Sequence, residues 1–156
     1  MIANFYTVIL LVEMLTLEEL AIDTRQLPSD GSSLWAGMGD YLLRSPDDRH
    51  FLRLTYVAEP PFGDCYQTLS IDGIAFPGWA WGCCFAFSPE SRYVAFSWMA
   101  RRYERQTVVV DVQARRFSVL PEYMFDFTFC WPALVGCGKW EGLTYRFNGQ
   151  ETWQAY

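Results

Sequence analysis

The chain has 156 residues, which is enough for one domain with a buried core and few for two domains. Apolar residues make up 51% of it and aromatic residues 18%, so disorder is excluded and strands, which pack aromatic side chains well, are favoured. A net charge of -6 disfavours nucleic acids and anionic membrane surfaces as partners, because their phosphate groups repel an acidic protein.

The first predicted element is the apolar run of residues 6–12, which no basic residue precedes and Glu13 interrupts. It lacks the charged start of a secretion signal and is too short to span a bilayer, so we expect a buried strand. Residues 16–19 (TLEE) have the spacing of a capping box and predict a short helix over residues 16–21. A strand at residues 20–23 would belong to a degenerate first sheet unit.

Two segments then repeat at a spacing of about 40 residues, the size of one propeller blade. Residues 45–52 (SPDDRHFL) align with residues 88–95 (SPESRYVA), and residues 67–72 (QTLSID) align with residues 106–111 (QTVVVD). The loops between the aligned segments differ in length and composition, which is typical of variable connections on a shared scaffold.

Each copy predicts the series strand, tight turn, strand, loop, strand, turn and strand, over residues 41–76 and 85–120. The loops inside the copies are residues 58–64, rich in Pro and Gly, and residues 100–105, which are highly charged. In the second copy the predicted strands are 85–87, 93–99, 106–112 and 117–120.

The tight turn of each copy has a physical explanation. Proline sets φ at the second turn position, while serine and acidic side chains bond to nearby backbone groups. We therefore favour the interpretation that Asp47, Asp48 and Glu90 stabilise these turns.

Residues 87–96 (FSPESRYVAF), followed by residues 107–112 (TVVVDV), resemble one blade of a WD-repeat or Tol-system β-propeller. The family pattern is Phe-Ser-Pro-Asp-Gly, an apolar strand and a second apolar strand ending in Asp. This chain has Ser91 where the family has Gly, and no Trp-Asp pair closes a blade. The resemblance covers about residues 40–121 and implies a binding platform with no particular activity.

The C-terminal part predicts further strands. Residues 125–131 alternate apolar and polar side chains, and Asn148-Gly149 between residues 143–147 and 151–154 is a strong hairpin signal. The predicted fold class is all-β: antiparallel, propeller-blade-like sheet repeats in one domain over residues 1–156. The units are 1–39, 40–80, 84–121 and 122–156, and either a small propeller or an open curved sheet or sandwich would accommodate them.

Catalytic chemistry is not supported by any motif. His50 is the one histidine, and no Gly-x-Ser-x-Gly or other nucleophile context accompanies it. The five cysteines lack both the spacing of a zinc site and the regularity of a disulfide framework, so we expect reduced thiols in a cytoplasmic protein. We predict no enzyme activity, no catalytic residue, no metal and no cofactor.

Binding residues are expected where the copies differ. Trp79 and Trp81 follow a Pro-Gly pair, and the basic strip of residues 101–105 lies in the loop of the second copy. Trp, Tyr and Arg concentrate binding energy at protein interfaces. Residues 1–48 carry the net negative charge of the chain, which would steer a basic partner toward it.

These observations predict a non-catalytic protein-binding protein, specifically an immunity protein that binds and neutralises a cognate toxin such as a basic nuclease. The expected partner-binding residues are Glu18, Glu19, Asp47, Asp48, Trp79, Trp81, Arg101 and Arg102. The alternatives are a carbohydrate-binding or ligand-binding β module, which would cluster exposed Trp on one sheet face, and a small hydrolase that relies on His50. Open sheet edges also predict a homodimer.

Overall fold

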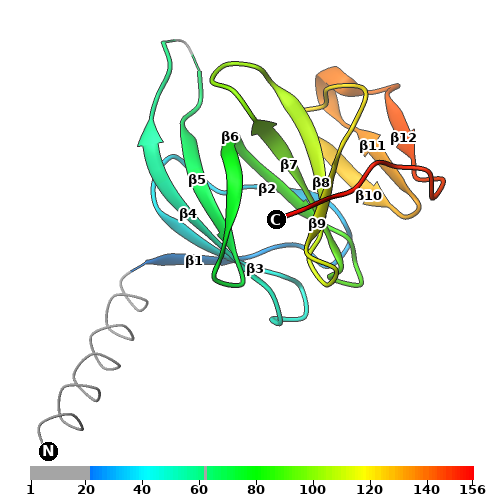
Figure 1. Cartoon of the computed structure of the whole chain (residues 1–156), viewed down its shortest axis with the longest axis horizontal. Coiled ribbons are helices and arrows are strands. Elements are labelled where there is room, and N and C mark those ends of the chain that lie inside the picture. The colour runs from blue at the N-terminus through cyan, green and yellow to red at the C-terminus, as the bar shows by residue number, and fades with distance from the viewer. Residues whose placement is uncertain (1–21, 62) are drawn as a thin grey trace, which may run out of the picture.

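The computed structural model describes residues 22–61 and 63–156, and the all-β prediction is confirmed in this part of the chain (Figure 1). The strands are β1 (Asp23–Gln26), β2 (Ser33–Trp35), β3 (Tyr41–Arg44), β4 (Phe51–Ala58), β5 (Tyr66–Ile71), β6 (Ile74–Phe87), β7 (Tyr93–Met99), β8 (Gln106–Asp111), β9 (Arg116–Val119), β10 (Phe127–Cys130), β11 (Ala133–Gly136), β12 (Thr144–Arg146) and β13 (Gln154–Ala155), with the short 3-10 turn η1 (Gly138–Trp140). Among these residues no helix is long and apolar enough to cross a membrane.

The strands form one large sheet and one small sheet. The large, ten-stranded sheet has the order β1-β3-β4-β5-β6-β7-β8-β9-β13, and β2 pairs with β6 beside that path. Neighbours from β3 to β9 are antiparallel, whereas β1 runs parallel to β3. The small sheet contains β10, β11 and β12. Within the described residues these strands close neither a barrel nor a ring of blades.

The longest strand, β6, has 14 residues and belongs to both halves of the large sheet. Its first part pairs with β5, its last part pairs with β2, and its register with β7 shifts between Ala80 and Phe85. Gly82 and Cys83 lie in this interval with positive φ angles of 103° and 64°. A Cβ at Gly82 would lie 2.1 Å from the Phe125 ring, so only glycine fits there. The chain therefore bends sharply within β6.

This bend brings the two halves of the sheet face to face around the main core. The Phe76 ring on β6 lies 5.0 Å from the Phe117 ring on β9 and 5.0 Å from the Tyr156 ring, although β6 and β9 are not neighbouring strands. Both halves contribute fully buried apolar side chains: Leu43, Leu52, Leu54, Leu69, Val94, Phe96, Val108 and Val110. The core is thus enclosed by one sheet folded over on itself.

A second core covers the opposite face of the second half. Ala86, Ala95 and Val109 project from that face and pack with Phe127 and Phe129 of the small sheet, which Figure 1 shows beside β7 and β8. β7 and β8 are consequently buried on both faces. This double burial explains why their sequences are nearly continuous apolar runs and do not alternate with polar residues.

The two repeated Ser-Pro turns have the same backbone conformation. Asp48 and Ser91 occupy equivalent positions and both have φ of 61°, in the left-handed region that favours the Gly of the blade pattern. In each turn the serine hydroxyl accepts a hydrogen bond from the amide five residues later, at 3.1 Å and 3.0 Å. The Asp47 amide donates to the Ser91 hydroxyl at 3.1 Å, so the two turns are in direct contact.

The first described strand and the boundary between the two repeat units lie at positions other than those predicted. The run 6–12 and the helix expected at 16–21 lie outside the described residues, and the strand expected at 20–23 is observed a few residues later as β1. The boundary between units 40–80 and 84–121 falls inside β6, because the bend lets one strand serve both copies.

The predicted hairpin around Asn148-Gly149 is wrong, because β12 pairs with β11 while β13 pairs with β9. The Glu151 carboxylate accepts hydrogen bonds from the amides of Asn148 and Gly149 at 2.7 Å and 3.0 Å. A side chain therefore closes this turn, and the chain crosses from the small sheet to the large one.

A buried ion pair anchors the turn at the end of β8. Asp111 is fully buried, accepts hydrogen bonds from Arg92 Nη2 at 3.0 Å and from the Ala114 amide at 3.1 Å, and lies 3.4 Å from Arg116 Nε. Burial by itself would raise the pKa of Asp111, but these hydrogen bonds and the two guanidinium charges outweigh it. The pKa of Asp111 therefore lies below its ordinary value.

We expect Phe76→Ala to reduce the free energy of unfolding by about 3–5 kcal/mol, because it empties a space lined by Phe96, Trp98, Phe117 and Tyr156. Urea denaturation measures this loss. The control Phe51→Ala removes a ring that is 38% exposed and should cost far less. Equal losses for the two variants would contradict a core closed between the two halves.

We expect the native state to lose stability below about pH 4, as falling pH passes from the ordinary carboxyl pKa of about 3.9 through the lowered pKa of folded Asp111. A group with a depressed folded pKa contributes its stability above the unfolded pKa. Asp111→Asn should cost about 2 kcal/mol at pH 7 and flatten the acid limb of a stability-versus-pH curve. An acid limb as steep as that of the parent protein would contradict this role.

Candidate functional site

Several segments meet at one end of the large sheet, which we call the loop end; they are residues 58–61, 63–65, 78–84 and 100–105. The Trp81 indole Nε1 donates a hydrogen bond to the Asp64 carbonyl at 2.9 Å, and the Gly82 amide donates to the Cys65 carbonyl at 3.2 Å. These bonds fasten the loop that follows β4 to the bend of β6. The variable loops of the two copies therefore converge on one surface.

Four aromatic rings from three elements form a cluster at the loop end, in which Tyr66 and Trp81 are buried and Tyr103 is exposed. Tyr66 of β5 contacts Trp79 of β6 edge to face at 6.3 Å and Tyr103 of the 100–105 loop at 6.4 Å. Trp81 contacts Tyr103 in the same geometry at 5.8 Å. Edge-to-face pairs are the favourable arrangement of aromatic quadrupoles, so each ring fixes the orientation of the next.

Two arginines of the 100–105 loop cover the tryptophans. The guanidinium of Arg105 lies 3.9 Å from the centre of the Trp81 ring, and that of Arg102 lies 5.6 Å from the centre of the Trp79 ring. Among residues 22–61 and 63–156, neither guanidinium lies within 4.0 Å of a carboxylate oxygen. Their N–H donors are therefore available for a ligand.

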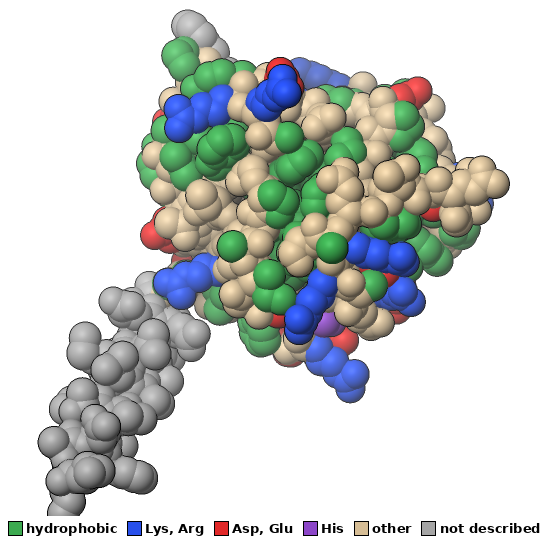
Figure 2. Space-filling model, in the orientation of Figure 1, with side chains coloured by type: hydrophobic (Ala, Val, Ile, Leu, Met, Phe, Trp, Pro, Cys, Tyr) green, Lys and Arg blue, Asp and Glu red, His purple; other side chains and the backbone are tan. Residues whose placement is uncertain are grey.

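Exposed apolar side chains surround this cluster. Tyr103 is 56% exposed, and the other large exposed apolar residues of this end lie on β4, on β2 and in the loop that precedes β3: Tyr56, Val57, Trp35 and Met38. A cavity of about 420 Å³ opens there, lined by Pro60, Pro61, Gly63, Trp81, Tyr103 and Arg105. Figure 2 shows basic side chains among hydrophobic ones along the upper edge of the molecule, where the tips of β4 to β7 lie in Figure 1.

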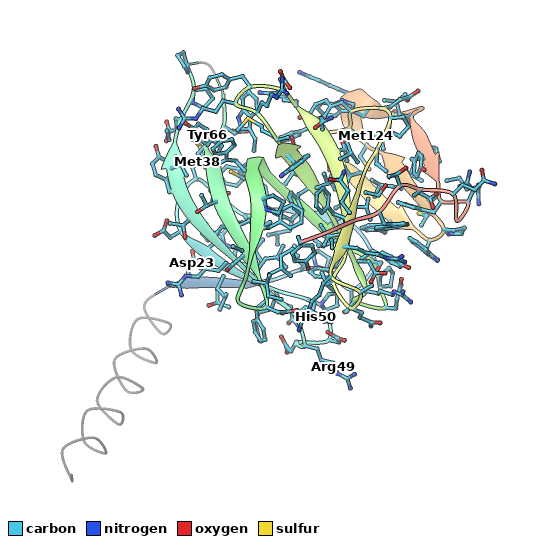
Figure 3. All side chains as sticks on the ribbon, in the orientation of Figure 1. Asp23, Met38, Arg49, His50, Tyr66 and Met124 are labelled. Carbon is cyan, nitrogen blue, oxygen red and sulfur yellow. The ribbon has the colours of Figure 1, made fainter. Side chains whose placement is uncertain are left out.

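Only part of the predicted site belongs to the loop end. Trp79, Trp81 and Arg102 come together there, and Arg101 is exposed in the same loop. The opposite end of the sheet carries the Ser-Pro turns, and Figure 3 shows Tyr66 and His50 at these two ends.

The two predicted acids that the structure describes lie at the turn end. Asp47 and Asp48 lie in the first Ser-Pro turn, where Asp47 accepts a hydrogen bond from the Ser45 hydroxyl at 2.6 Å and Asp48 pairs with Arg44 at 2.9 Å. The remaining acids, Glu18 and Glu19, lie outside the described residues. The structure thus does not join Asp47 and Asp48 with the predicted aromatics into one surface.

The sequence alone did not single out Tyr66, Tyr103 or Arg105. Tyr103 and Arg105 belong to the basic strip of residues 101–105, whose Arg-Tyr-Arg composition was a usable signal. Tyr66 gave no such signal, because it begins a strand and its role depends on the pairing of Tyr66 with Trp81 across β5 and β6.

The histidine lies at the turn end. His50 Nδ1 lies 2.7 Å from the Asp72 carboxylate, whose other oxygen accepts the Phe51 amide at 2.8 Å. This contact stabilises the end of β5 in the first repeat, as the contact of Asp111 with Arg92 stabilises the end of β8 in the second repeat. No group of three or more His, Cys, Asp or Glu side chains in the described residues could hold a metal ion.

A second cavity, of about 380 Å³, lies on the outer face of β3 to β5, lined by Ile22, Leu42, Phe51, Arg53, Ser70, Asp72 and Gly73. Its carboxylate, Asp72, is already bonded to His50 and to the Phe51 amide, which leaves Arg53 and Ser70 as its polar groups. The loop end combines exposed aromatic and guanidinium groups from more elements than this cavity does, so we take the loop end as the candidate functional site.

Comparison of the chain with protein-family models, with curated proteins and with solved structures found no match. The function is therefore inferred from the geometry of the loop end.

We expect Trp81→Phe to loosen the loop end, because it removes the indole N–H bonded to the Asp64 carbonyl. The loss should be about 1 kcal/mol in the free energy of unfolding, with faster amide hydrogen exchange at residues 63–65. Trp79→Phe is the matched control, since its indole nitrogen makes no hydrogen bond within the described residues. Equal exchange in the two variants would contradict the anchoring role of Trp81.

Proposed function

We propose that this protein is a non-catalytic binding protein that engages another protein through the loop end. The observation that carries the proposal is the exposed ring of Tyr103 beside two arginines that lack a carboxylate partner in the described structure, all held over the buried Trp81 and half-buried Trp79. Trp, Tyr, Met and Arg are the residues enriched at protein interfaces, and Trp, Tyr and Arg dominate their energetic centres.

The arrangement of the cluster lowers the cost of binding. Each immobilised side chain at an interface costs about 0.5–1.5 kcal/mol of conformational entropy. Tyr66, Trp79, Trp81 and Tyr103 already restrain one another, and the arginines stack on the indoles before any partner arrives. A partner would therefore meet a surface that is largely organised in advance.

The charge of the loop end defines the contact surface of the partner. We expect the partner to present carboxylates to Arg101, Arg102 and Arg105. A planar guanidinium that already stacks on an indole, as in Arg102 and Arg105, can still donate two parallel hydrogen bonds to a carboxylate. The basic partner predicted from residues 1–48 would be steered by the overall charge of the chain, and would still need acidic residues at its contact surface.

The specific form of this proposal is the immunity function predicted from the sequence, in which the protein neutralises a cognate toxin. A protein that covers a toxin's active surface needs a rigid binding face and no catalytic chemistry of its own. The small size of the chain and the convergence of variable loops at the loop end support this form.

The environment of the tryptophans supports a carbohydrate-binding module less well than a protein-binding one. Sugars stack on open ring faces, but Trp131 is stacked between Tyr93 at 4.1 Å and Phe147 at 5.0 Å. Trp79 and Trp81 are covered by Arg102 and Arg105. A protein partner, which can use aromatic edges and guanidinium groups together, suits these rings better.

The test uses the product of the gene adjacent to this one as the partner. The partner is co-expressed with this protein, and its binding to the purified protein is then measured by isothermal titration. Tyr103→Ala and Arg105→Ala should each weaken binding about 30-fold, as expected for central interface residues. Arg49→Ala is the matched control, an exposed arginine at the turn end, and should leave binding unchanged.

Binding that survives the double variant Tyr103→Ala, Arg105→Ala would contradict the loop end as the interface. For the immunity form, cells that express the neighbouring gene should be protected by the parent protein and not by the double variant. Absence of both binding and protection with the parent protein would overturn that form of the proposal.

A further inference from the structure

We infer that Cys65 and Cys83 are a site of disulfide formation that cross-links the base of the loop end. Their sulfur atoms lie 3.5 Å apart, in direct contact, and both side chains are buried. All five cysteines are free thiols in the described structure. The inference is independent of the proposed function.

The pairing of β5 with β6 creates this contact. Cys65 directly precedes Tyr66, which pairs with Trp81, and the Gly82 amide donates to the Cys65 carbonyl at 3.2 Å. Cys83 follows with a φ of 64°, within the interval where the register of β6 is interrupted. A sulfur–sulfur bond is about 2.05 Å long, so the two atoms need to approach by about 1.5 Å, which small side-chain rotations can supply.

The neighbouring cysteines have other contacts, which makes the pair specific. Cys84 Sγ lies 3.7 Å from the Asp126 carboxylate, and Cys137 Sγ lies 3.3 Å from the Thr128 hydroxyl. Cys130 is exposed on β10. Within residues 22–61 and 63–156, Cys65 and Cys83 are therefore the one pair of thiols in mutual contact.

The reaction is thiol–disulfide exchange with a small-molecule disulfide such as oxidised glutathione. One cysteine thiolate attacks the oxidant, forms a mixed disulfide and releases one glutathione thiol. The second cysteine then attacks the mixed disulfide, forms the Cys65–Cys83 bond and releases the second glutathione thiol. Two electrons pass from the cysteines to the oxidant, and the two protons end on the two released thiols.

Burial governs when this reaction takes place. Burial is the main cause that raises the pKa of both the Cys65 and Cys83 thiols, so little thiolate is present in the folded protein at neutral pH. The pair therefore reacts during folding, or during openings of the loop end, more readily than in the closed native state. Once formed, the bond joins Asp64 and Tyr66 to the bend of β6 and restricts those openings.

The test refolds the full chain from denaturant in a buffer of reduced and oxidised glutathione, with a fully reduced sample as reference. The monomer should lose about 2 Da in intact mass and unfold at a higher temperature than the reduced sample. Because no Lys or Arg lies between Arg53 and Arg92, chymotrypsin is needed to separate the linked segments for peptide mapping.

Matched variants assign the bond. Cys84→Ala and Cys130→Ala should retain the mass loss and the thermal shift, whereas Cys65→Ala and Cys83→Ala should abolish both. Circular dichroism of the reduced variants establishes that each one folds. A bond that involves Cys84 or Cys130, or a parent protein that stays fully reduced after oxidative refolding, would overturn the inference. Partner binding measured on reduced protein remains a separate test of the proposed function.

Discussion

The bend within β6 is the constraint on which the rest of the structure depends. Gly82 can adopt its φ of 103° and can approach the Phe125 ring closely because it has no Cβ, and Cys83 follows it with a positive φ as well. A straight 14-residue strand would extend the sheet in one plane. The bent strand instead turns the second half of the sheet over the first, and Phe76 then meets Phe117 across the core.

The same bend also shapes the loop end, the surface that we propose binds a partner. It directs Trp79 and Trp81 toward the loop that follows β4 and toward the 100–105 loop, where Tyr103 and Arg105 complete the cluster. Packing and recognition are therefore linked through one short segment. Cys83 belongs to that segment and contacts Cys65, which directly precedes β5, so the disulfide that we infer would act on the connection between core and surface.

The two ends of the sheet differ in how their charged side chains are paired. At the turn end, polar groups are paired with one another, as in the contacts of Asp111 with Arg92 and of His50 with Asp72. At the loop end, the arginines stack on aromatic rings and lack carboxylate partners in the described structure. Paired charges stabilise the turns, while charges without a partner carboxylate remain available for binding.

The sequence by itself determined the local structure. The Ser-Pro turns, the strand at 93–99 and the all-β class follow from turn chemistry and from apolar runs that act over a few residues. It also predicted Trp79, Trp81 and the basic strip as binding residues, a prediction that their unusual composition favours and that the proposed function keeps. Only the tertiary structure decided which strands pair, and so it overturned the hairpin at Asn148-Gly149. It likewise separated Asp47 and Asp48 from the aromatic cluster and placed Cys65 against Cys83, since contacts between distant residues depend on how the sheet folds over and not on any local pattern.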